Sequence, residues 1–168
     1  MQGKGRLIAT DHDKRQLAPI HERLSRAGVH NADVRAPKGD TDPLGDIRAS
    51  ADLVLIDAPC TGTGTWRRNP DAKWRIRPGA LEVRLKEQAA VLDRAAPLVK
   101  PGGRIAYVTC SLLAEENGDQ VRGFLARHPG FAVAPPAELL APLGERALIF
   151  RQAVLMTEEG VQMTPRRT

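Results

Sequence analysis

The segment that most restricts the fold is ADLVLIDAP, residues 51–59, where a continuous apolar run stops at an acid and a proline. Such a run predicts a strand buried on both faces, as in the middle of a parallel sheet. Residues 5–11 and 104–110 are also short apolar runs, and they end on Asp11 and Cys110. Buried strands with helical segments between them predict an α/β sandwich with a mostly parallel sheet.

The segments around these strands set the expected order of elements. Apolar residues at helical spacing predict three helices, over 13–28, over 79–100 and over the stretch that ends near 128. Pro19 fits the first helix if it lies in the first turn or two, and Glu115 and Glu116 are expected in the first turn of the third. Further strands are expected over 31–37, 131–136, 146–156 and 160–165, and a loop over 38–50.

Length and composition favour one kind of protein. A chain of 168 residues predicts a single domain, and its 42% apolar and 27% charged residues are typical of a folded soluble protein. The sequence has neither an apolar stretch as long as a membrane span nor the apolar core of a signal peptide, so we expect a cytoplasmic protein with no membrane partner. The net charge of +5 favours a polyanionic partner. The two cysteines form no CxxC and the four histidines are scattered, so no metal site is expected.

Two thiols and an acid are expected at one edge of the sheet. In parallel α/β sheets, ligands bind beyond the carboxyl ends of the strands, where Asp11, Asp57 and Cys110 are predicted to converge. A thiol between a strand end and a helix N-terminus can have a lowered pKa, which favours a nucleophilic Cys110. Cys60 follows the Asp57 turn and belongs to the same edge. The alternatives are a buried cysteine that acts as a small hydrophobe and acids that only cap turns.

A basic aromatic loop follows Cys60. In GTGTWRRNPDAKWR, residues 62–75, Arg67, Arg68 and Lys73 can meet phosphates, and Trp66 or Trp74 can stack on a base. The alternative is a solvated loop whose tryptophans pack on the core. The two glycines of the loop form no dinucleotide fingerprint, because the third glycine of that motif is missing.

Two long segments carry a family resemblance. DAPCTGTGTWRRNPDAKWR and, later in the chain, LVKPGGRIAYVTCSLLAEEN resemble the paired signature segments of the Sun (Fmu) family of RNA cytosine carbon-5 methyltransferases. The resemblance extends from about Gly5 to Thr168. It implies a Rossmann-like class I methyltransferase fold, S-adenosylmethionine as methyl donor and RNA as substrate, with ribosomal RNA as the default by analogy.

The resemblance also implies roles for single residues. Cys110 looks like the nucleophile, Cys60 like the cysteine that helps release the product, and Asp57 like the acid that contacts the target base beside the cofactor. Asp11 falls where the family binds the cofactor ribose. The best match for the acid near the adenine is Asp40, with Asp33 and Asp42 as weaker candidates. The residues expected to meet RNA are Pro59, Trp66, Arg67, Arg68 and Lys73. DNA cytosine methyltransferases use the cysteine of the DAPC-like position as nucleophile, so Cys60 stays the competing attacker.

The sequence departs from the family pattern at both ends. The family carries a glycine-rich D-x-C-A-A-P-G-G-K-T loop just before the segment that matches GRLIATD, and a D-G-F-F strand at the end, whereas this chain begins at MQGKG and stops at Thr168. We therefore expect residues 1–168 to be a partial catalytic domain whose sheet lacks its first and last strands. Self-association could then cover the incomplete sheet. Two other hypotheses stay open, a non-catalytic RNA-binding remnant and a thiol-redox protein with a disulfide between the two cysteines.

Overall fold

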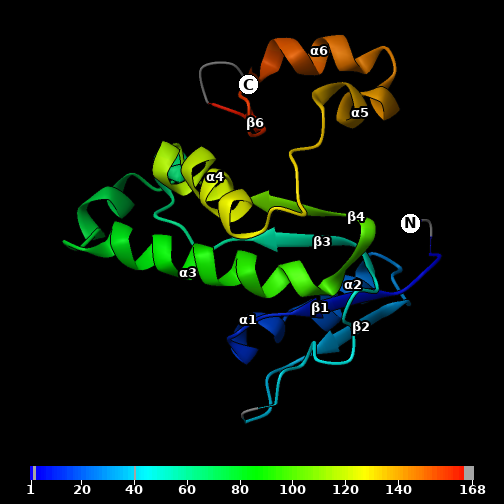
Figure 1. The fold of residues 1–168 in the computed structure, drawn as a ribbon. Helices are drawn as coiled ribbons and strands as arrows, with labels where there is room; N and C mark the ends of the chain where they lie inside the picture. The colour runs from blue at the N-terminus through cyan, green and yellow to red at the C-terminus, as the bar shows by residue number, and fades with distance from the viewer. Residues whose placement is uncertain (2, 40, 165–168) are drawn as a thin grey trace. The chain divides into compact units, whose positions relative to one another are not determined.

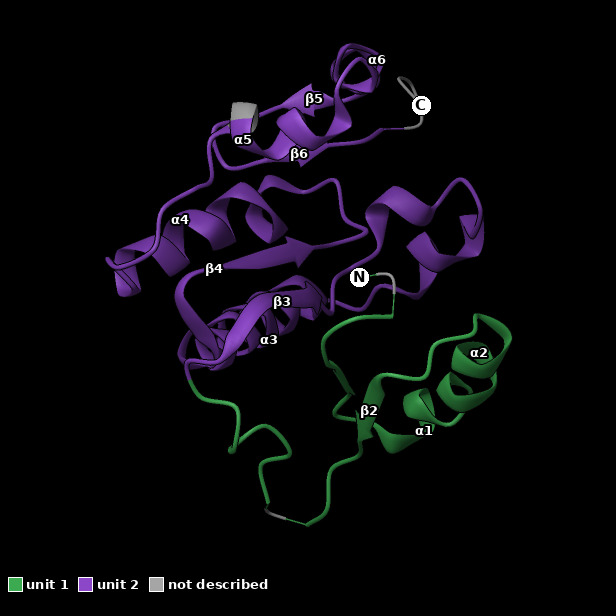
Figure 2. Cartoon of the chain, turned by 90° about the vertical axis from the view of Figure 1, so that its right-hand side faces the viewer, with its two compact units in different colours: residues 1–48 green, residues 49–168 purple. Residues whose placement is uncertain are grey.

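A computed structural model describes residues 1, 3–39 and 41–164 of the chain (Figure 1). The chain divides into two compact units, Met1–Arg48 and Ala49–Thr168, and each is described here by itself (Figure 2). The expected single domain over residues 1–168 stays a prediction.

The first unit is built on one parallel strand pair. Strand β1 (Leu7–Thr10) pairs in parallel with β2 (Ala32–Arg35), and both lie within segments predicted to be strands. The expected single helix between them is two helices, α1 (Lys14–Leu17) and α2 (Ile20–Arg26), and Pro19 is the N-cap of the second. A proline has no N–H to donate to the preceding turn, so the helix breaks there and restarts.

The second unit holds the other parallel pair. Strand β3 (Ala51–Asp57) pairs with β4 (Val99–Val108), and the register sets Asp57 opposite Val108. Helix α3 (Ala80–Ala95) makes the crossover between them, and α4 (Gly118–Arg127) follows β4. These helices pack on one face of the pair, where the buried core consists of Ile56, Ala58, Leu92, Ala95 and Phe124.

The opposite face of this strand pair is apolar and open. Side chains alternate along a strand, so Leu53 and Leu55 point away from the core that Ile56 enters. They are 58% and 68% exposed. The parallel pairs with their helices confirm the predicted α/β class.

Two boundaries around β4 differ from the predictions. The helix expected to run to residue 100 ends at Ala95, and a 3-10 turn over Ala96–Leu98 leads into a longer strand. Pro97 in that turn cannot donate to the preceding helical turn, which ends the α-helix early. The helix expected after Cys110 is divided into the 3-10 helix η4 (Ala114–Glu116) and α4, and Glu116 is buried rather than in the first turn of a surface helix.

The strands predicted near the carboxyl end are mostly wrong. Residues 131–135 form no strand, helix α5 (Pro136–Leu140) begins where the first of these strands was expected to end, and helix α6 (Arg146–Ala153) occupies most of a segment predicted to be extended. Good helix formers such as Ala, Leu, Arg and Gln outnumber β-branched residues in α6. Among the described residues of this region, which end at 164, the strands are β5 (Leu155–Met156) and β6 (Val161–Gln162), paired as an antiparallel hairpin. In the described parts of the chain, no helix is both long and apolar enough to cross a membrane.

Candidate active site

The carboxyl ends of β3 and β4 bring the predicted acid and thiol to one edge. Asp57 is the last residue of β3, and Cys110 lies two residues beyond the end of β4. Because the strands are parallel neighbours, both chains leave the sheet on the same side. The backbone continues the pairing for one more residue, since the Ala58 N–H donates to the Val108 carbonyl at 2.9 Å.

The two thiols meet at this edge. The Sγ atoms of Cys60 and Cys110 are 3.2 Å apart, and both cysteines are free. The loop after Cys60 lies directly on Cys110, because the Gly64 N–H donates to the Cys110 carbonyl at 2.9 Å. A Cβ on Gly64 would come within 2.8 Å of that same oxygen, so this close approach requires glycine.

The environment of Cys110 opposes thiolate formation in the free protein. The pKa of Cys110 is raised to about 11, first by partial burial, then by its contact with Cys60 and by the negative charge of Asp57. The expectation of a lowered pKa is therefore wrong. Its physical basis is missing, because α4 begins only at Gly118 and Cys110 is not in its first turn.

Polar side chains hold the Cys110 loop in shape. The Thr63 and Ser111 hydroxyl oxygens are 3.0 Å apart, and the Leu112 N–H donates to Thr63 Oγ1 at 2.8 Å. Asn117 accepts from the Thr109 hydroxyl at 2.7 Å and donates to the Ser111 carbonyl at 3.0 Å. These bonds fix the backbone on both sides of Cys110.

A buried carboxylate holds the loop of Cys60. Glu116 is fully buried, and its Oε1 accepts from the Thr61 N–H at 2.8 Å and from Gln88 Nε2 at 3.0 Å. Gln88 Nε2 also donates to the Pro59 carbonyl at 2.8 Å. Burial raises the pKa of Glu116, but hydrogen bonds from Ser111, Thr61 and Gln88 outweigh it and leave the pKa below its ordinary value.

The basic loop presents one of its two tryptophans. Trp74 is 80% exposed, and the Lys73 ammonium lies 4.8 Å from the centroid of its ring. Trp66 is half-buried, and its indole N–H is buried without a partner among the described residues. Arg67 and Arg68 are exposed beside it. Trp74 is therefore the tryptophan whose ring face a base can reach, although Trp66 was the one placed in the RNA set.

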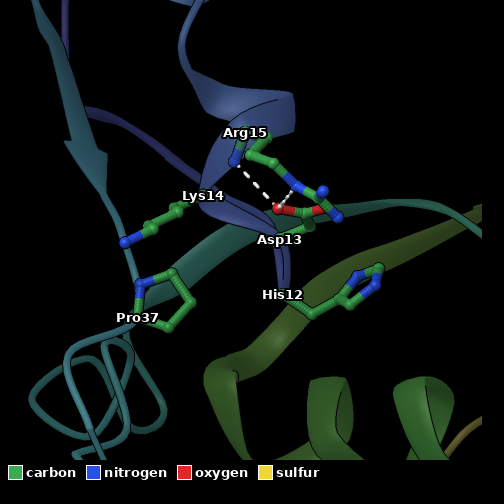
Figure 3. A pocket seen from close by; sticks show the side chains of 5 residues that line it. All are labelled: His12, Asp13, Lys14, Arg15 and Pro37. Atoms are coloured by element: carbon green, nitrogen blue, oxygen red, sulfur yellow. Dashed lines mark hydrogen bonds and ion pairs between the residues drawn. The ribbon is translucent and has the colours of Figure 1, made fainter.

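In the first unit, Asp11 follows β1. Its Oδ1 accepts from the Asp13 N–H at 2.8 Å and lies 3.1 Å from His12 Nδ1, whereas Oδ2 accepts no hydrogen bond from the described residues. The residues that follow Asp11 in the chain line a cavity of about 460 Å³ (Figure 3). It is lined by His12, Asp13, Lys14, Arg15 and Pro37. Asp11 lies in the first unit and Asp57 and Cys110 lie in the second, so their convergence stays a prediction.

The three candidates for the acid near the adenine differ in their surroundings. Asp40 lies outside the described residues. Asp33 is paired with Arg6 at 2.7 Å and with Arg35 at 2.9 Å, and these arginines hold the pKa of its carboxyl below the usual range. Asp42 Oδ1 accepts from the Leu44 N–H at 3.1 Å, as in a turn. In the part of the chain that the structure describes, no group of three or more acidic, histidine or cysteine side chains could hold a metal ion.

Comparison with known proteins identifies the family. The family model for 16S rRNA methyltransferase RsmB/F matches residues 1–146. The chain belongs to the RsmB/F methyltransferase family. Ribosomal RNA small subunit methyltransferase B of Salmonella newport (strain SL254) is 38% identical over 128 residues, which are 76% of this chain and 30% of that protein. The protein of the same name from Salmonella typhi matches equally well.

Solved structures agree with this family. The crystal structure of PH0851 superimposes with a TM-score of 0.75 at 38% identity, over 80% of this chain and 30% of that one. NSun6 from Pyrococcus horikoshii, solved with SFG, gives a TM-score of 0.63 at 31% identity, over 75% of this chain and 32% of that one. Membership of the RsmB/F family confirms the resemblance and the Rossmann-like methyltransferase fold. The chain spans about a third of the length of these relatives.

Two buried polar side chains beside the thiols were not predicted from the sequence. Glu116 was expected only near a helix N-terminus, and Gln88 was not singled out. Glu116 stands in the second signature segment, which was the one available signal. Gln88 lies on α3 among apolar residues, and no sequence pattern distinguishes a buried amide there from a surface one.

Proposed function

We propose that this chain carries the thiol half of an RNA (cytosine carbon-5) methyltransferase site, with ribosomal RNA as substrate and S-adenosylmethionine as methyl donor. The observation that carries the proposal is the pair of free thiols 3.2 Å apart at the strand edge where Asp57 ends β3. Membership of the RsmB/F family supports the RNA substrate and the methyl donor. A ribosomal RNA substrate also implies a cytoplasmic location.

The chemistry explains why this family needs a thiol. Carbon 5 of cytosine is a poor nucleophile, and addition of the Cys110 sulfur to carbon 6 makes it a good one. S-adenosylmethionine supplies the methyl group when bound. After carbon 5 has taken the methyl group, it must lose its proton, and the bond between sulfur and carbon 6 then breaks to restore the ring. Cys60 is close enough to Cys110 to take part in this release step.

Asp57 and the raised pKa of Cys110 fit the addition step of this scheme. The thiol is protonated at neutral pH, so its proton must leave as the sulfur bonds to carbon 6, and ring nitrogen 3 of cytosine, whose basicity rises in that step, is the group that would take it up. The Asp57 carboxylate would then accept a hydrogen bond from the protonated ring nitrogen. A base that pairs with the Asp57 carboxylate also reduces the negative field that raises the pKa of Cys110.

Asp11 suits one part of the methyl donor. Its Oδ2 is open among the described residues, and a carboxylate after a strand of a nucleotide-binding sheet commonly accepts from ribose hydroxyls. The adjacent cavity of about 460 Å³ leaves room beside it. Asp57 and Asp40 are the other acids that we assign to the donor.

The basic loop is the proposed RNA surface. Trp74 would stack on an unpaired base, while Arg67, Arg68 and Lys73 would meet phosphates. Pro59 and Trp66 stay in the proposed RNA set, Pro59 beside the thiols and Trp66 at the base of the loop. We also propose that self-association covers the open apolar face of β3.

An adduct experiment tests the proposal. The purified chain, its Cys60→Ala variant and its Cys110→Ala variant are incubated with unmodified 16S rRNA transcript and S-adenosylmethionine labelled in the methyl group. We expect label in RNA from the unchanged protein, a covalent protein–RNA adduct with Cys60→Ala and neither with Cys110→Ala. The reverse pattern for the two variants would make Cys60 the nucleophile. RNA binding without any label or adduct would support the non-catalytic RNA-binding remnant instead.

Calorimetry separates methyl-donor binding from chemistry. Titration of the chain with S-adenosylmethionine is expected to give binding that Asp11→Ala abolishes. Asp13→Ala is the matched control, because Asp13 lines the same cavity but its carboxylate is occupied by Arg15. Equal loss in both variants would show that the cavity, rather than the Asp11 carboxylate, determines binding.

A further inference from the structure

The two completely buried polar side chains beside the thiols have no part in the proposed chemistry. Glu116 and Gln88 are both 0% exposed. A buried carboxylate is normally paired with a cation, yet every hydrogen bond that the structure gives Glu116 comes from a neutral donor. Burial of a carboxylate without a cation lowers the stability of the fold, so the position of Glu116 needs an explanation.

Most hydrogen bonds of the Glu116 carboxylate lead to the loop of Cys60, and Ser111, the neighbour of Cys110, supplies another. Its two carboxylate oxygens accept from the N–H and the hydroxyl of Thr61, the residue after Cys60. Gln88 Nε2 bridges Glu116 Oε1 to the carbonyl of Pro59, the residue before Cys60. Cys60 is therefore held from both sides by one carboxylate and one amide.

The other side of this arrangement is attached to the Cys110 segment. Glu116 belongs to η4, which follows Cys110 in the chain, and its backbone carbonyl accepts from the Tyr107 hydroxyl at 2.8 Å. Tyr107 is on β4, three residues before Cys110. The carboxylate thus connects the loop that carries Cys60 to the strand and turn that carry Cys110.

Gln88 has one possible orientation in this network. Both of its contacts are acceptors, the Pro59 carbonyl and a Glu116 carboxylate oxygen, so the amide nitrogen must face them. Its Oε1 is buried without a partner in the described structure. The two bonds from nitrogen alone therefore fix the amide.

We propose that Glu116, acting through Thr61 and Gln88, is a positioning residue that sets the spacing of the Cys60 and Cys110 thiols. Its consequence for methyl transfer rests on the proposed function, but the spacing itself does not. An uncharged amide at 116 can keep most of the network, because the Thr61 hydroxyl can accept from it as readily as it donates. An alanine removes the carboxylate and with it the bonds from Thr61 and Gln88 to residue 116.

Thiol oxidation measures the spacing without any RNA or methyl donor. Diamide takes two hydrogens from a thiol pair and leaves a disulfide, so the protein loses two hydrogens and diamide becomes the hydrazine. Mass spectrometry of the whole chain follows the rate at which the protein loses these two hydrogens. In the unchanged protein the two sulfurs are already in contact, so we expect rapid intramolecular oxidation.

Four variants decide the proposal. Glu116→Ala is expected to slow disulfide formation at least tenfold, and Thr61→Val at least threefold. Glu116→Gln is expected to keep most of the rate of the unchanged protein. Glu115→Ala is the matched control, because Glu115 is the exposed neighbour on the same 3-10 helix, and it is expected to oxidise like the unchanged protein. Circular dichroism verifies the fold of each variant, and Thr61→Val tests the proposal if Glu116→Ala does not fold. Equal oxidation rates in folded Thr61→Val and Glu115→Ala would overturn it.

A kinetic readout connects the spacing to methyl transfer. If the proposed function holds, Glu116→Ala lowers kcat and leaves KM for RNA unchanged, because the basic loop is not part of the network. If the chain transfers no methyl group, the oxidation rates still decide the positioning role. The failure of the proposed function and the failure of this inference are thus distinguishable.

Discussion

Single side chains at the strand edge control the state of the proposed nucleophile. Asp57 adds a negative charge beside Cys110 and so contributes to its raised pKa of about 11. A group with a raised thiol pKa is uncharged below that pKa and becomes a thiolate only as the pH rises through it. Alkylation of Cys110 by iodoacetamide is therefore expected to accelerate up to about pH 11.

Asp57→Asn removes that charge, so we expect the alkylation profile of Cys110 to shift to lower pH, with faster labelling at pH 9. Labelling of each cysteine is measured by peptide mass spectrometry. Asp52→Asn is the control, because Asp52 lies on the same strand but pairs with Lys100. An unchanged profile in Asp57→Asn would show that burial and Cys60 alone raise the pKa.

At the scale of elements, the sequence predicts the strands of the two parallel pairs better than it predicts helix boundaries or the strands near the carboxyl end. The apolar runs of β1 and β3 end on acids, and both lie where the pattern indicated. Helix breaks at Pro19 and Pro97 depend on where a proline falls within the first or last turn, which periodicity does not specify. Helix α6 was predicted to be extended because its apolar residues are adjacent rather than spaced.

Local sequence patterns likewise predict one part of the candidate site and miss another. Strand ends predict that Asp57 and Cys110 share an edge, because parallel topology follows from local patterns. The hydrogen bonds of Glu116 join residues 55 and 28 positions apart, and one of the donors is a backbone N–H of an irregular loop. No local pattern encodes such contacts, and so this part of the site could not be predicted.

The basic loop makes its own prediction at this scale. Stacking of a base on an aromatic ring is worth roughly 1–3 kcal/mol, so Trp74→Ala is expected to weaken binding of a single-stranded RNA by about 5- to 150-fold. Trp74→Phe keeps a ring and should lose much less. Fluorescence anisotropy with a labelled RNA oligonucleotide measures both.

Trp66 supplies the comparison for this prediction. Its indole N–H is buried, so Trp66→Phe is expected to lower the melting temperature more than RNA affinity. If Trp66→Phe weakened RNA binding more than Trp74→Ala did, the exposed ring would not be the stacking surface.

For the molecule as a whole, the open face of the β3–β4 pair is the dominant feature. Leu53 and Leu55 are more than half exposed, although the strand that carries them is mostly apolar. Full burial of a leucine contributes roughly 1.5–3 kcal/mol, so an apolar strand face of this kind favours association. The net charge of +5 opposes association only weakly once salt screens it.

We therefore expect the purified chain to self-associate, and the Leu53→Ser/Leu55→Ser double variant to be monomeric, in sedimentation equilibrium at physiological salt. Both substitutions lie on the face away from Ile56 and Leu92, so they leave the packed core of the unit intact. Val83→Ser is the matched control, because Val83 is 54% exposed on α3, and it should associate like the unchanged chain. A double variant that associates as strongly as the Val83→Ser control would place the contact elsewhere than on this sheet face.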